Sequence, residues 1–259
     1  MGHDHSPELS IVVPCYNEED CIGTTMPHLA EVFQKAGIDF EIVMVDNGSR
    51  DRTGAIIDDL IARGLPIRKA VVPVNRGWGL GIRTGVNAAR GRYIGTLCAD
   101  GQVAPESVLL IYRSLAAAGG STMAKARRRF RPDGPVRKVV SIIYNALMLV
   151  LFPGLRTLDV NGYPKIFPAD ILRSMDLSSD DWFLDAETML KAQYLRLMVI
   201  EIDVPGHLRK GGRSNVRIKT VFEFLLNIVR YRFGGPWREW RRQMSNAVAR
   251  EVSARVGQA

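Results

Sequence analysis

The sequence predicts an α/β fold built on a mainly parallel sheet, because strand-like and helix-like segments alternate over its first hundred residues. Three apolar runs of strand length, at residues 9–13, 40–45 and 92–97, each lead into a polar segment. Open α/β sheets bind their ligands outside the carboxyl ends of the strands. We therefore expect the polar residues after these runs, including Asp46 and Asp100, to line one rim of the sheet.

The other elements follow in order along the chain. Helices are expected from residue 20 through 33, from residues 51–53 onward, over 82–89, over 105–118 and from residue 185. Short strands are expected at 70–73, 121–126, 166–167 and 201–205. A glycine-rich turn at 75–81 precedes one helix, and its backbone amides suit either a pyrophosphate or a tight structural turn.

Positive charge is concentrated in two blocks of the chain, which has a net charge of +8. One block covers residues 127–138 and the other covers 230–242. Such blocks suit anionic partners, among them phosphates, pyrophosphates and acidic lipids. Because no nucleic-acid-binding motif accompanies them, nucleic acid is not an expected partner. The three cysteines have neither disulfide-framework nor zinc-site spacing, which fits a reducing cytosol.

One uncharged segment is almost long enough to cross a membrane. Residues 139–155 carry no charge, but Asn145 interrupts this run and Pro153 with Gly154 ends it. A spanning helix needs about 20 apolar residues. We therefore expect a buried or membrane-surface helix here rather than a span.

A second segment has the composition of a membrane-surface anchor. Residues 218–232 predict an amphipathic helix, which Trp237, Trp240 and several arginines follow. Its apolar face consists of Val221, Phe222, Leu225, Leu226 and Val229. Packing of this face on the protein's own core is the alternative. With the uncharged segment as a second such helix, we expect a cytoplasmic protein that associates peripherally with the anionic inner face of a membrane.

Three short motifs carry a resemblance to a known family. They are Pro14-x-Tyr16-Asn17-Glu18, the segment from Val45 to Thr53 that reads VDNGSRDRT, and Ala99-Asp100-x-Gln102. In order and spacing they resemble the family 2 glycosyltransferases with a GT-A fold, over roughly residues 9–215. The match is nearest to the branch of dolichol-phosphate mannose synthases and other polyprenyl-phosphate glycosyltransferases. In that branch the acidic motif reads Asp-Ala-Asp-x-Gln, whereas here Cys98 stands in place of the first aspartate.

The resemblance implies a donor site and a metal site. The residues expected to bind a nucleotide-diphosphate sugar are Pro14, Tyr16, Asn17, Glu18, Asp46, Asn75, Gly77, Ala99, Asp100, Gln102, Arg127, Arg209 and Ser214. Asp100 and Gln102 are expected to hold one divalent cation, Mg²⁺ or Mn²⁺, since hard cations prefer oxygen ligands and a neutral thiol is a poor ligand for them. Arg127 is expected to meet the donor phosphates, and its neighbour Arg128 is expected to face solvent.

The same resemblance implies a catalytic set of Asp100, Asp185 and Glu187. The family carries acidic residues at the start of a helix facing the acceptor, where Asp185 and Glu187 fall in this chain. The alternative is that Asp185 is an N-cap and Glu187 a first-turn residue, since acidic side chains are common there.

The domain organisation expected from these features has three parts. They are a disordered tail at 1–8, a glycosyltransferase domain at 9–217 and an amphipathic helical region at 218–259. Within the domain we expect a nucleotide-binding half at about 9–130, a helical insert at about 132–155 and an acceptor half at about 156–217. A chain of 259 residues is long enough for one such α/β domain and too short for two.

The implied reaction is an inverting transfer of a sugar from GDP-mannose or a UDP-sugar to a polyprenyl phosphate. Such an acceptor is already an anion and needs no base, whereas a hydroxyl acceptor would need one, with Asp185 as the candidate. A non-catalytic sugar-nucleotide-binding protein is a further alternative, because Cys98 departs from the motif. A nucleotidyltransferase is disfavoured, because Pro14 to Glu18 stand where its glycine- and lysine-bearing loop would lie.

Overall fold

A computed structural model of the chain describes residues 6–130, 135–155, 157–206 and 218–256, without the side chains of 129–140, 218–225, 236 and 247–256. The chain forms two compact units, Met1–Ser214 and Asn215–Ala259. The expected site residues Arg209 and Ser214, with most of the loop around them, lie outside the described residues.

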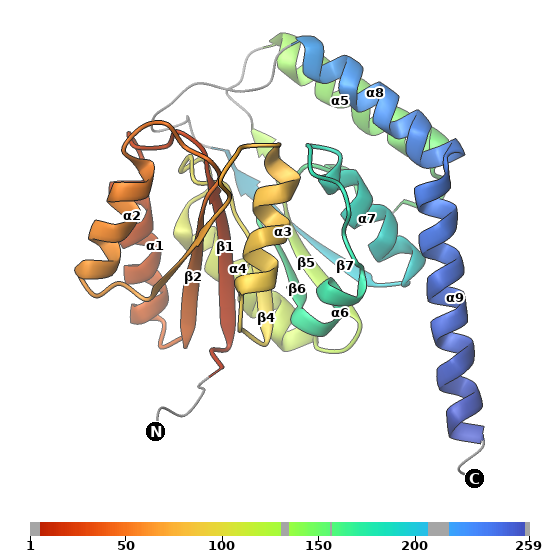
Figure 1. Ribbon diagram of the computed structural model, residues 1–259, viewed down its shortest axis with the longest axis horizontal. Helices are drawn as coiled ribbons and strands as arrows, with labels where there is room; N and C mark the ends of the chain where they lie inside the picture. Colours follow the sequence, from red (N-terminus) through yellow and green to blue (C-terminus); the bar gives the residue numbers. More distant parts are fainter. Residues whose placement is uncertain (1–5, 131–134, 156, 207–217, 257–259) are drawn as a thin grey trace. The chain divides into compact units, whose positions relative to one another are not determined.

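The first unit contains one mixed sheet whose strand order is β3-β2-β1-β4-β6-β5-β7 (Figure 1). The strands are β1 (Leu9–Cys15), β2 (Phe40–Asp46), β3 (Ile67–Val71), β4 (Tyr93–Thr96), β5 (Thr122–Phe130), β6 (Lys165–Pro168) and β7 (Met198–Pro205). Among the strands in the described ranges, β6 alone runs antiparallel to its neighbours, β4 and β5. The mainly parallel α/β sheet expected from the sequence is confirmed.

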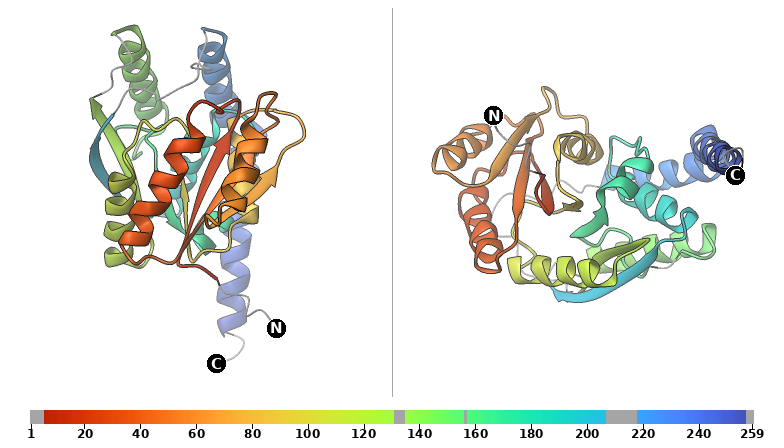
Figure 2. Two further views of the ribbon diagram at one scale, coloured as in Figure 1. Left: turned by 90° about the vertical axis from the view of Figure 1, so that its left-hand side faces the viewer. Right: turned by 90° about the horizontal axis from the view of Figure 1, so that it is seen from below.

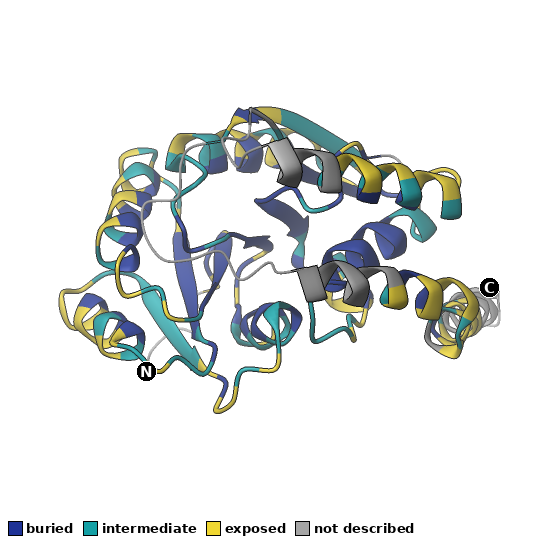
Figure 3. Ribbon diagram, turned by 90° about the horizontal axis from the view of Figure 1, so that it is seen from above, coloured by how far each residue is buried: buried dark blue, intermediate teal, exposed yellow. Residues whose placement is uncertain are grey.

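Helices connect these strands and cover both faces of the sheet. They are α1 (Ile22–Lys35), α2 (Thr53–Ala62), α3 (Trp78–Ala88), α4 (Pro105–Ala118), α5 (Pro135–Leu151), α6 (Ala169–Ser174) and α7 (Leu184–Tyr194). Figure 2 shows α1 and α4 on one side of the sheet and α3 on the other. Strands β1, β2, β4 and β6 are buried along most of their length, whereas the edge strands β3 and β7 are mostly only partly buried. Helices α1 and α2 bury one side each (Figure 3).

Alternation along β1 divides its side chains between the two helical layers. Leu9, Ile11 and Val13 join the apolar core formed with α1, α2 and α4. Val12 points the other way, toward α3, where Gly85 leaves no room for a Cβ above the Val12 side chain. The close approach of α3 to β1 therefore depends on a glycine at this position.

Several expected boundaries differ from those observed, three of them near the rim. The strand expected at 70–73 is β3, which begins at Ile67 and pairs with β2 through Val45 and Ala70. The helix expected at 82–89 begins at Trp78, so Gly79 and Gly81 belong to α3 rather than to the turn. Asp185 is not the N-cap of α7, because Phe183 occupies that position.

Helix α5 buries one side and exposes apolar residues on the other. Tyr144 and Met148, one turn apart, are buried, whereas Ile142, Ile143 and Val150 are largely exposed. In the described part of the chain, no helix has both the length and the apolar character required to cross a membrane.

The second unit consists of α8 (Ile218–Phe233) and α9 (Gly235–Val256), which contact each other. Trp237 stacks on Trp240 with ring centroids 5.4 Å apart, and Tyr231 packs against Trp237 at the same separation. Leu226 and Val229, two residues of the apolar face expected on this helix, are each 50% exposed.

Candidate active site

The loops after β1 and β2 are joined by hydrogen bonds between backbone and side chains. Asn17, which has φ +54°, accepts from the Arg50 amide through Oδ1 at 2.9 Å and donates through its own amide to Ser49 Oγ at 3.2 Å. The Glu18 amide donates to Thr53 Oγ1 at 2.8 Å. Two motifs thirty residues apart in the sequence therefore form one rigid rim.

Asp46 ends β2 directly opposite Cys15 of β1. Its Oδ1 accepts from the Ser49 amide at 3.0 Å, and a Cβ on Gly54 would lie 2.6 Å from its Oδ2. Tyr16, the next residue after β1, is half-buried. The structure thus brings Pro14, Tyr16 and Asp46 to the carboxyl ends of adjacent strands, as the sequence predicts.

The glycine-rich turn packs on a protein segment. Asn75 Oδ1 accepts from the Gly77 amide at 3.0 Å, and Asn47 Nδ2 donates to the Gly77 carbonyl at 2.9 Å. Gly77 has φ +136°, and a Cβ there would collide with the Asp180 carbonyl. Both this conformation and the close packing require glycine, so the structure explains why residue 77 is a glycine. A contact of Asn75 and Gly77 with pyrophosphate stays a prediction.

Asp100 and Gln102 follow β4 on the same rim. Asp100 is 6% exposed, and its Oδ1 accepts from the Gln102 amide at 3.1 Å. Directly before Asp100, Ala99 is buried and its carbonyl accepts from the Cys21 thiol. We call residues 14–18, 46–53 and 98–102 the strand rim.

The donor set of the strand rim fits one divalent cation bound together with phosphate. Asp100 supplies a carboxylate and Gln102 an amide oxygen, and Mg²⁺ commonly takes one or two carboxylates plus substrate phosphates. Burial raises the pKa of the Cys98 thiol, and the adjacent Asp100 raises it further, so this side chain stays neutral. Within the described residues no three His, Cys, Asp or Glu side chains gather into a metal site.

Asp185 lies in the first turn of α7 and is held by groups from two other segments. Its Oδ1 accepts from Lys165 Nζ at 2.7 Å and from the Tyr163 hydroxyl. The Lys165 and Asp185 side chains are only 2% and 4% exposed. Burial and the Asp185 carboxylate raise the pKa of Tyr163, which keeps its hydroxyl protonated as the donor. That hydroxyl in turn accepts from Trp78 Nε1 at 2.9 Å.

Glu187 is buried on the opposite side of the same helical turn. Its Oε1 lies 2.7 Å from Lys191 Nζ and accepts from the Ser178 amide, and its Oε2 accepts from the Ser179 amide at 2.8 Å. Burial alone would raise its pKa, but Lys191 and these hydrogen bonds hold the pKa below its ordinary value. The carboxylate anchors the 178–181 segment, on which the glycine-rich turn packs.

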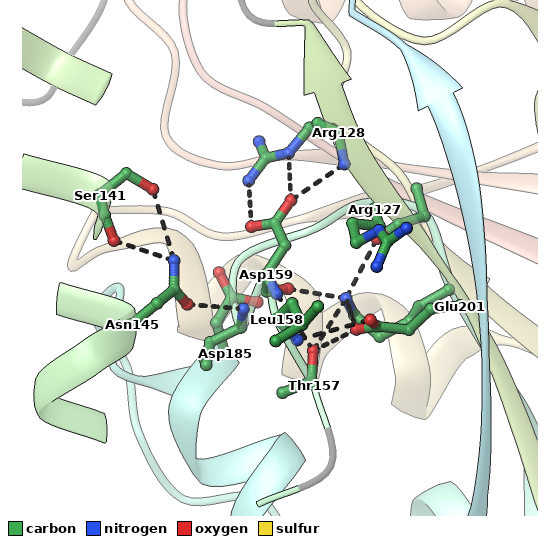
Figure 4. Close-up of polar contacts among 12 residues, drawn as sticks. Arg127, Arg128, Ser141, Asn145, Thr157, Leu158, Asp159, Asp185 and Glu201 are labelled. Atoms are coloured by element: carbon green, nitrogen blue, oxygen red, sulfur yellow. Dashed lines mark hydrogen bonds and ion pairs between the residues drawn. The ribbon is translucent and has the colours of Figure 1, made fainter. Parts of the chain in front are cut away.

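Neighbouring arginines on β5 point in opposite directions (Figure 4). Arg127 pairs with Asp203, its partner on β7, and both side chains are partly exposed. Arg128 pairs with Asp159 at 3.0 Å and is only 14% exposed, so the expectation that it faces solvent is wrong. Its charge lies close enough to Cys98 to act on that thiol, as do the charges of Asp185 and Lys165.

Four side chains that the sequence analysis did not assign to the site therefore lie beside it: Arg128, Asp159, Tyr163 and Lys165. We call Arg128, Asp159, Lys165 and Asp185 the ion-pair cluster. Tyr163 and Lys165 are two residues apart, a spacing that places side chains on one face of an extended segment. The spacing could have indicated from the sequence that Tyr163 and Lys165 act together. It does not identify Asp185 as the residue that accepts hydrogen bonds from both.

The family model described as "Glycosyl transferase family 2" matches residues 10–169 of the chain. These residues include the whole strand rim and most of the ion-pair cluster.

Similar proteins include several that act on polyprenyl phosphates by name. Dodecaprenyl-phosphate galacturonate synthase of Rhizobium johnstonii is 28% identical over 231 residues, covering 88% of this chain and 67% of that protein. Dolichol-phosphate mannosyltransferase of Pyrococcus furiosus is 25% identical, covering 86% of this chain and 63% of that protein. The chain thus spans about two thirds of the length of these relatives.

Among solved structures, glucosyl-3-phosphoglycerate synthase from Mycobacterium tuberculosis has a similar fold. Its complex with Mn²⁺, uridine diphosphate and glucosyl-3-phosphoglycerate superposes with a TM-score of 0.68 at 19% identity, covering 89% of this chain and 81% of that one. The expected GT-A fold is therefore confirmed. The match of the family model over more than half of its residues shows that this chain is a glycosyltransferase and belongs to glycosyl transferase family 2.

Proposed function

We propose that the protein transfers a sugar from a nucleotide-diphosphate sugar to a polyprenyl phosphate, with inversion at the anomeric carbon. The names of two relatives, a dodecaprenyl-phosphate galacturonate synthase and a dolichol-phosphate mannosyltransferase, support this acceptor class. The donor is GDP-mannose or a UDP-sugar, as expected from the sequence.

The observation that carries the acceptor assignment is the buried ion pair between Lys165 and Asp185. A general base must take up a proton during the reaction. Protonation of Asp185 would leave the Lys165 ammonium buried beside a neutral acid, and an unpaired buried charge is costly. A polyprenyl phosphate avoids this cost, because its oxygen is already ionised at neutral pH.

In this reaction a phosphate oxygen of the lipid attacks the anomeric carbon while the bond to the donor diphosphate breaks. The electron pair of that bond leaves on the nucleoside diphosphate, and no proton is transferred. A divalent cation held by Asp100 and Gln102 would neutralise charge on the leaving diphosphate. Arg128 is proposed to support the same task, because its guanidinium is mostly buried against Asp159 and its charge acts on the Cys98 thiol of the strand rim.

The rest of the rim is assigned to the nucleotide. Tyr16 and Asp46 hold the base and ribose, and Pro14, Asn17 and Glu18 shape the pocket around them. Asn75, Gly77 and Ala99 complete the donor side. Arg209 and Ser214, outside the described residues, are proposed to contact the phosphates, and Arg127, which the structure pairs with Asp203, is the weakest member of the set.

The acceptor implies a membrane surface, and the exposed apolar side of α5 supports it. Ile142 and Ile143 are 58% and 60% exposed, and basic residues precede them in the sequence. We propose peripheral attachment to the anionic inner face of a membrane, as expected for amphipathic helices with basic flanks.

A hydroxyl acceptor is the second candidate, with Asp185 as the base. One observation favours it: both hydrogen bonds that Asp185 accepts end on Oδ1, so its other oxygen is not engaged by Lys165 or Tyr163.

The test is an assay of purified protein with GDP- and UDP-sugars, Mg²⁺ or Mn²⁺, and a short-chain polyprenyl phosphate. We expect that nucleoside diphosphate is released from one of the two kinds of donor, the GDP-sugar or the UDP-sugar. We also expect this release to require the polyprenyl phosphate. Turnover with the corresponding polyprenol or with a hydroxyl acceptor, but not with the phosphate, would overturn the proposal.

A further inference from the structure

The carboxylate of Asp159 holds the guanidinium of Arg128 through two hydrogen bonds (Figure 4). Arg128 Nε donates to Oδ2 and Nη2 donates to Oδ1, each at 3.0 Å, and the Arg128 backbone amide donates to Oδ2 at 3.2 Å. A guanidinium has five N–H donors, so this fork leaves three that Asp159 does not use. A two-point contact of this kind fixes the plane of the guanidinium as well as its position.

The backbone of Asp159 is itself anchored from the opposite direction. Its carbonyl accepts from Lys125 Nζ at 2.6 Å and from the Gly162 amide at 2.9 Å. Lys125 is fully buried and forms an ion pair with Glu201 at 3.0 Å. Asp159 therefore cannot shift along the sheet without breaking a buried polar network.

Helix α5 fixes the same loop through Asn145, the polar residue that interrupts its apolar sequence. Asn145 Oδ1 accepts from the Val160 amide at 3.0 Å, and its Nδ2 donates to the Ser141 carbonyl at 2.9 Å. Val160 is buried, so its amide would lack this partner if Asn145 were apolar. Asn145 thus connects two parts of the protein: helix α5, which has an exposed apolar side, and the loop that carries Asp159, the partner of Arg128.

We propose that Asp159 is a positioning residue that aims Arg128 at a phosphate group in the active site, and that Asn145 of α5 holds the loop carrying Asp159. This inference rests on the proposed function only in taking a phosphate of the donor or of the acceptor as the ligand of Arg128.

The direction of one effect separates positioning from simple charge. Asp159 neutralises Arg128, so Asp159→Asn adds one positive charge near the site, and an electrostatic account predicts tighter phosphate binding. Positioning predicts the opposite, because the guanidinium loses its ionic fork and samples other orientations. We expect phosphate binding to weaken by about tenfold, the effect of one well-aligned hydrogen bond.

The experiment has two arms that distinguish the source of the phosphate. Calorimetric titration with UDP and GDP reads the donor diphosphate without any acceptor, and the KM for a short-chain polyprenyl phosphate at saturating donor reads the acceptor. Loss in the first arm places Arg128 on the donor, and loss in the second places it on the acceptor. Thermal unfolding of each variant confirms that it is folded.

A double-mutant cycle provides the decisive control. In an Arg128→Gln background, Asp159→Asn should cause no further loss of phosphate binding, since its effect passes through Arg128. Asp203→Asn, which releases the neighbouring Arg127, is the matched control and should leave both arms unchanged. Equal losses from Asp159→Asn with and without Arg128 would overturn the inference.

Asn145→Ala tests the link to α5 with a milder variant. We expect a loss of about threefold in the same arm as Asp159→Asn, since one backbone hydrogen bond is removed. Ser141→Ala, which keeps the backbone carbonyl that Asn145 contacts, should have no effect. If the wild type does not use polyprenyl phosphate, the proposed function fails, but the titration with UDP and GDP still decides this inference. Unchanged or tighter binding of the nucleoside diphosphate by Asp159→Asn would then overturn it.

Discussion

The strand rim and the ion-pair cluster face one site but are built by different interactions. In the strand rim, side chains such as Asp46, Asn17 and Asp100 accept hydrogen bonds from backbone amides. In the cluster, buried charges such as Lys165 and Asp185 pair with each other across distant elements. The strand rim therefore presents acidic side chains held by backbone amides, and the cluster presents cations that carboxylates orient.

The largest effect should come from the acidic group of the strand rim. Asp100→Ala removes the one carboxylate of its motif, and a bound metal supplies several kcal/mol of charge stabilisation in the transition state. We expect transfer to fall by about 10³-fold or more, and donor binding to lose its dependence on Mg²⁺ or Mn²⁺. Calorimetry with and without metal reads the second effect; near-normal activity with Mg²⁺ would remove Asp100 from the metal site.

The pair beside the cluster should matter more for stability than for chemistry. Lys191→Met leaves Glu187 buried without its cation, and breaking such a pair costs about 3–5 kcal/mol. The matched control is Lys35→Met, since Lys35 pairs with Glu31 at the surface, where the loss should be about 1 kcal/mol or less. Denaturant unfolding measures both; equal losses would mean that Glu187 is not held as a buried charge.

The two arginines of β5 should differ in their effect on phosphate binding. Arg128→Gln should weaken binding of a phosphate substrate by about 1.5–3 kcal/mol, the range for a hydrogen bond to a charged group. Arg127→Gln should have a much smaller effect, because Asp203 engages it on the outer face. Titration with nucleoside diphosphates and the acceptor KM check this, and a larger loss for Arg127 would reverse the assignment.

How much of this could be predicted varies between the two regions for a physical reason. The strand rim consists of three short motifs, each of which is local in sequence, so strand ends and turn residues such as Asp46 and Gly48 reveal it. The cluster depends on register across the antiparallel strand β6, which brings Lys165 beside the end of β4. No local pattern contains that register.

The arginines of β5 illustrate the same limit. Alternation shows that Arg127 and Arg128 face opposite sides, but the sequence does not say which side holds the site. The buried Asp159, which joins from a separate loop, makes that choice for Arg128. The glycine-rich segment at 75–81 illustrates a similar limit. Its glycines predict a turn, whereas α3 already begins at Trp78. Glycines of this helix allow close packing instead, Gly79 on Ser179 and Asp180 and Gly85 on Val12.

The cluster should also leave a mark on acid unfolding. Arg128 and Lys125 hold the pKa of Asp159 well below its usual range, despite the opposing effect of burial. The resulting stability is present above the unfolded-state pKa of about 4 and is lost as pH falls below it, by at most about 1.4 kcal/mol per pH unit. Asp159→Asn should flatten this acid limb in denaturant unfolding at pH 2–5, whereas an unchanged limb would show that Asp159 is not paired in solution.

The measurement that tests the central claim most directly is the transfer rate of Asp185→Asn with a saturating donor. With a lipid-phosphate acceptor the nucleophile is already ionised, so the rate should fall by less than about tenfold, and the wild-type rate should not follow the titration of a single carboxylate. With a hydroxyl acceptor, Asp185 would receive the proton, and general-base contributions reach about 10²–10⁴-fold. A fall of more than a hundredfold, with the donor still bound, would contradict the polyprenyl-phosphate assignment.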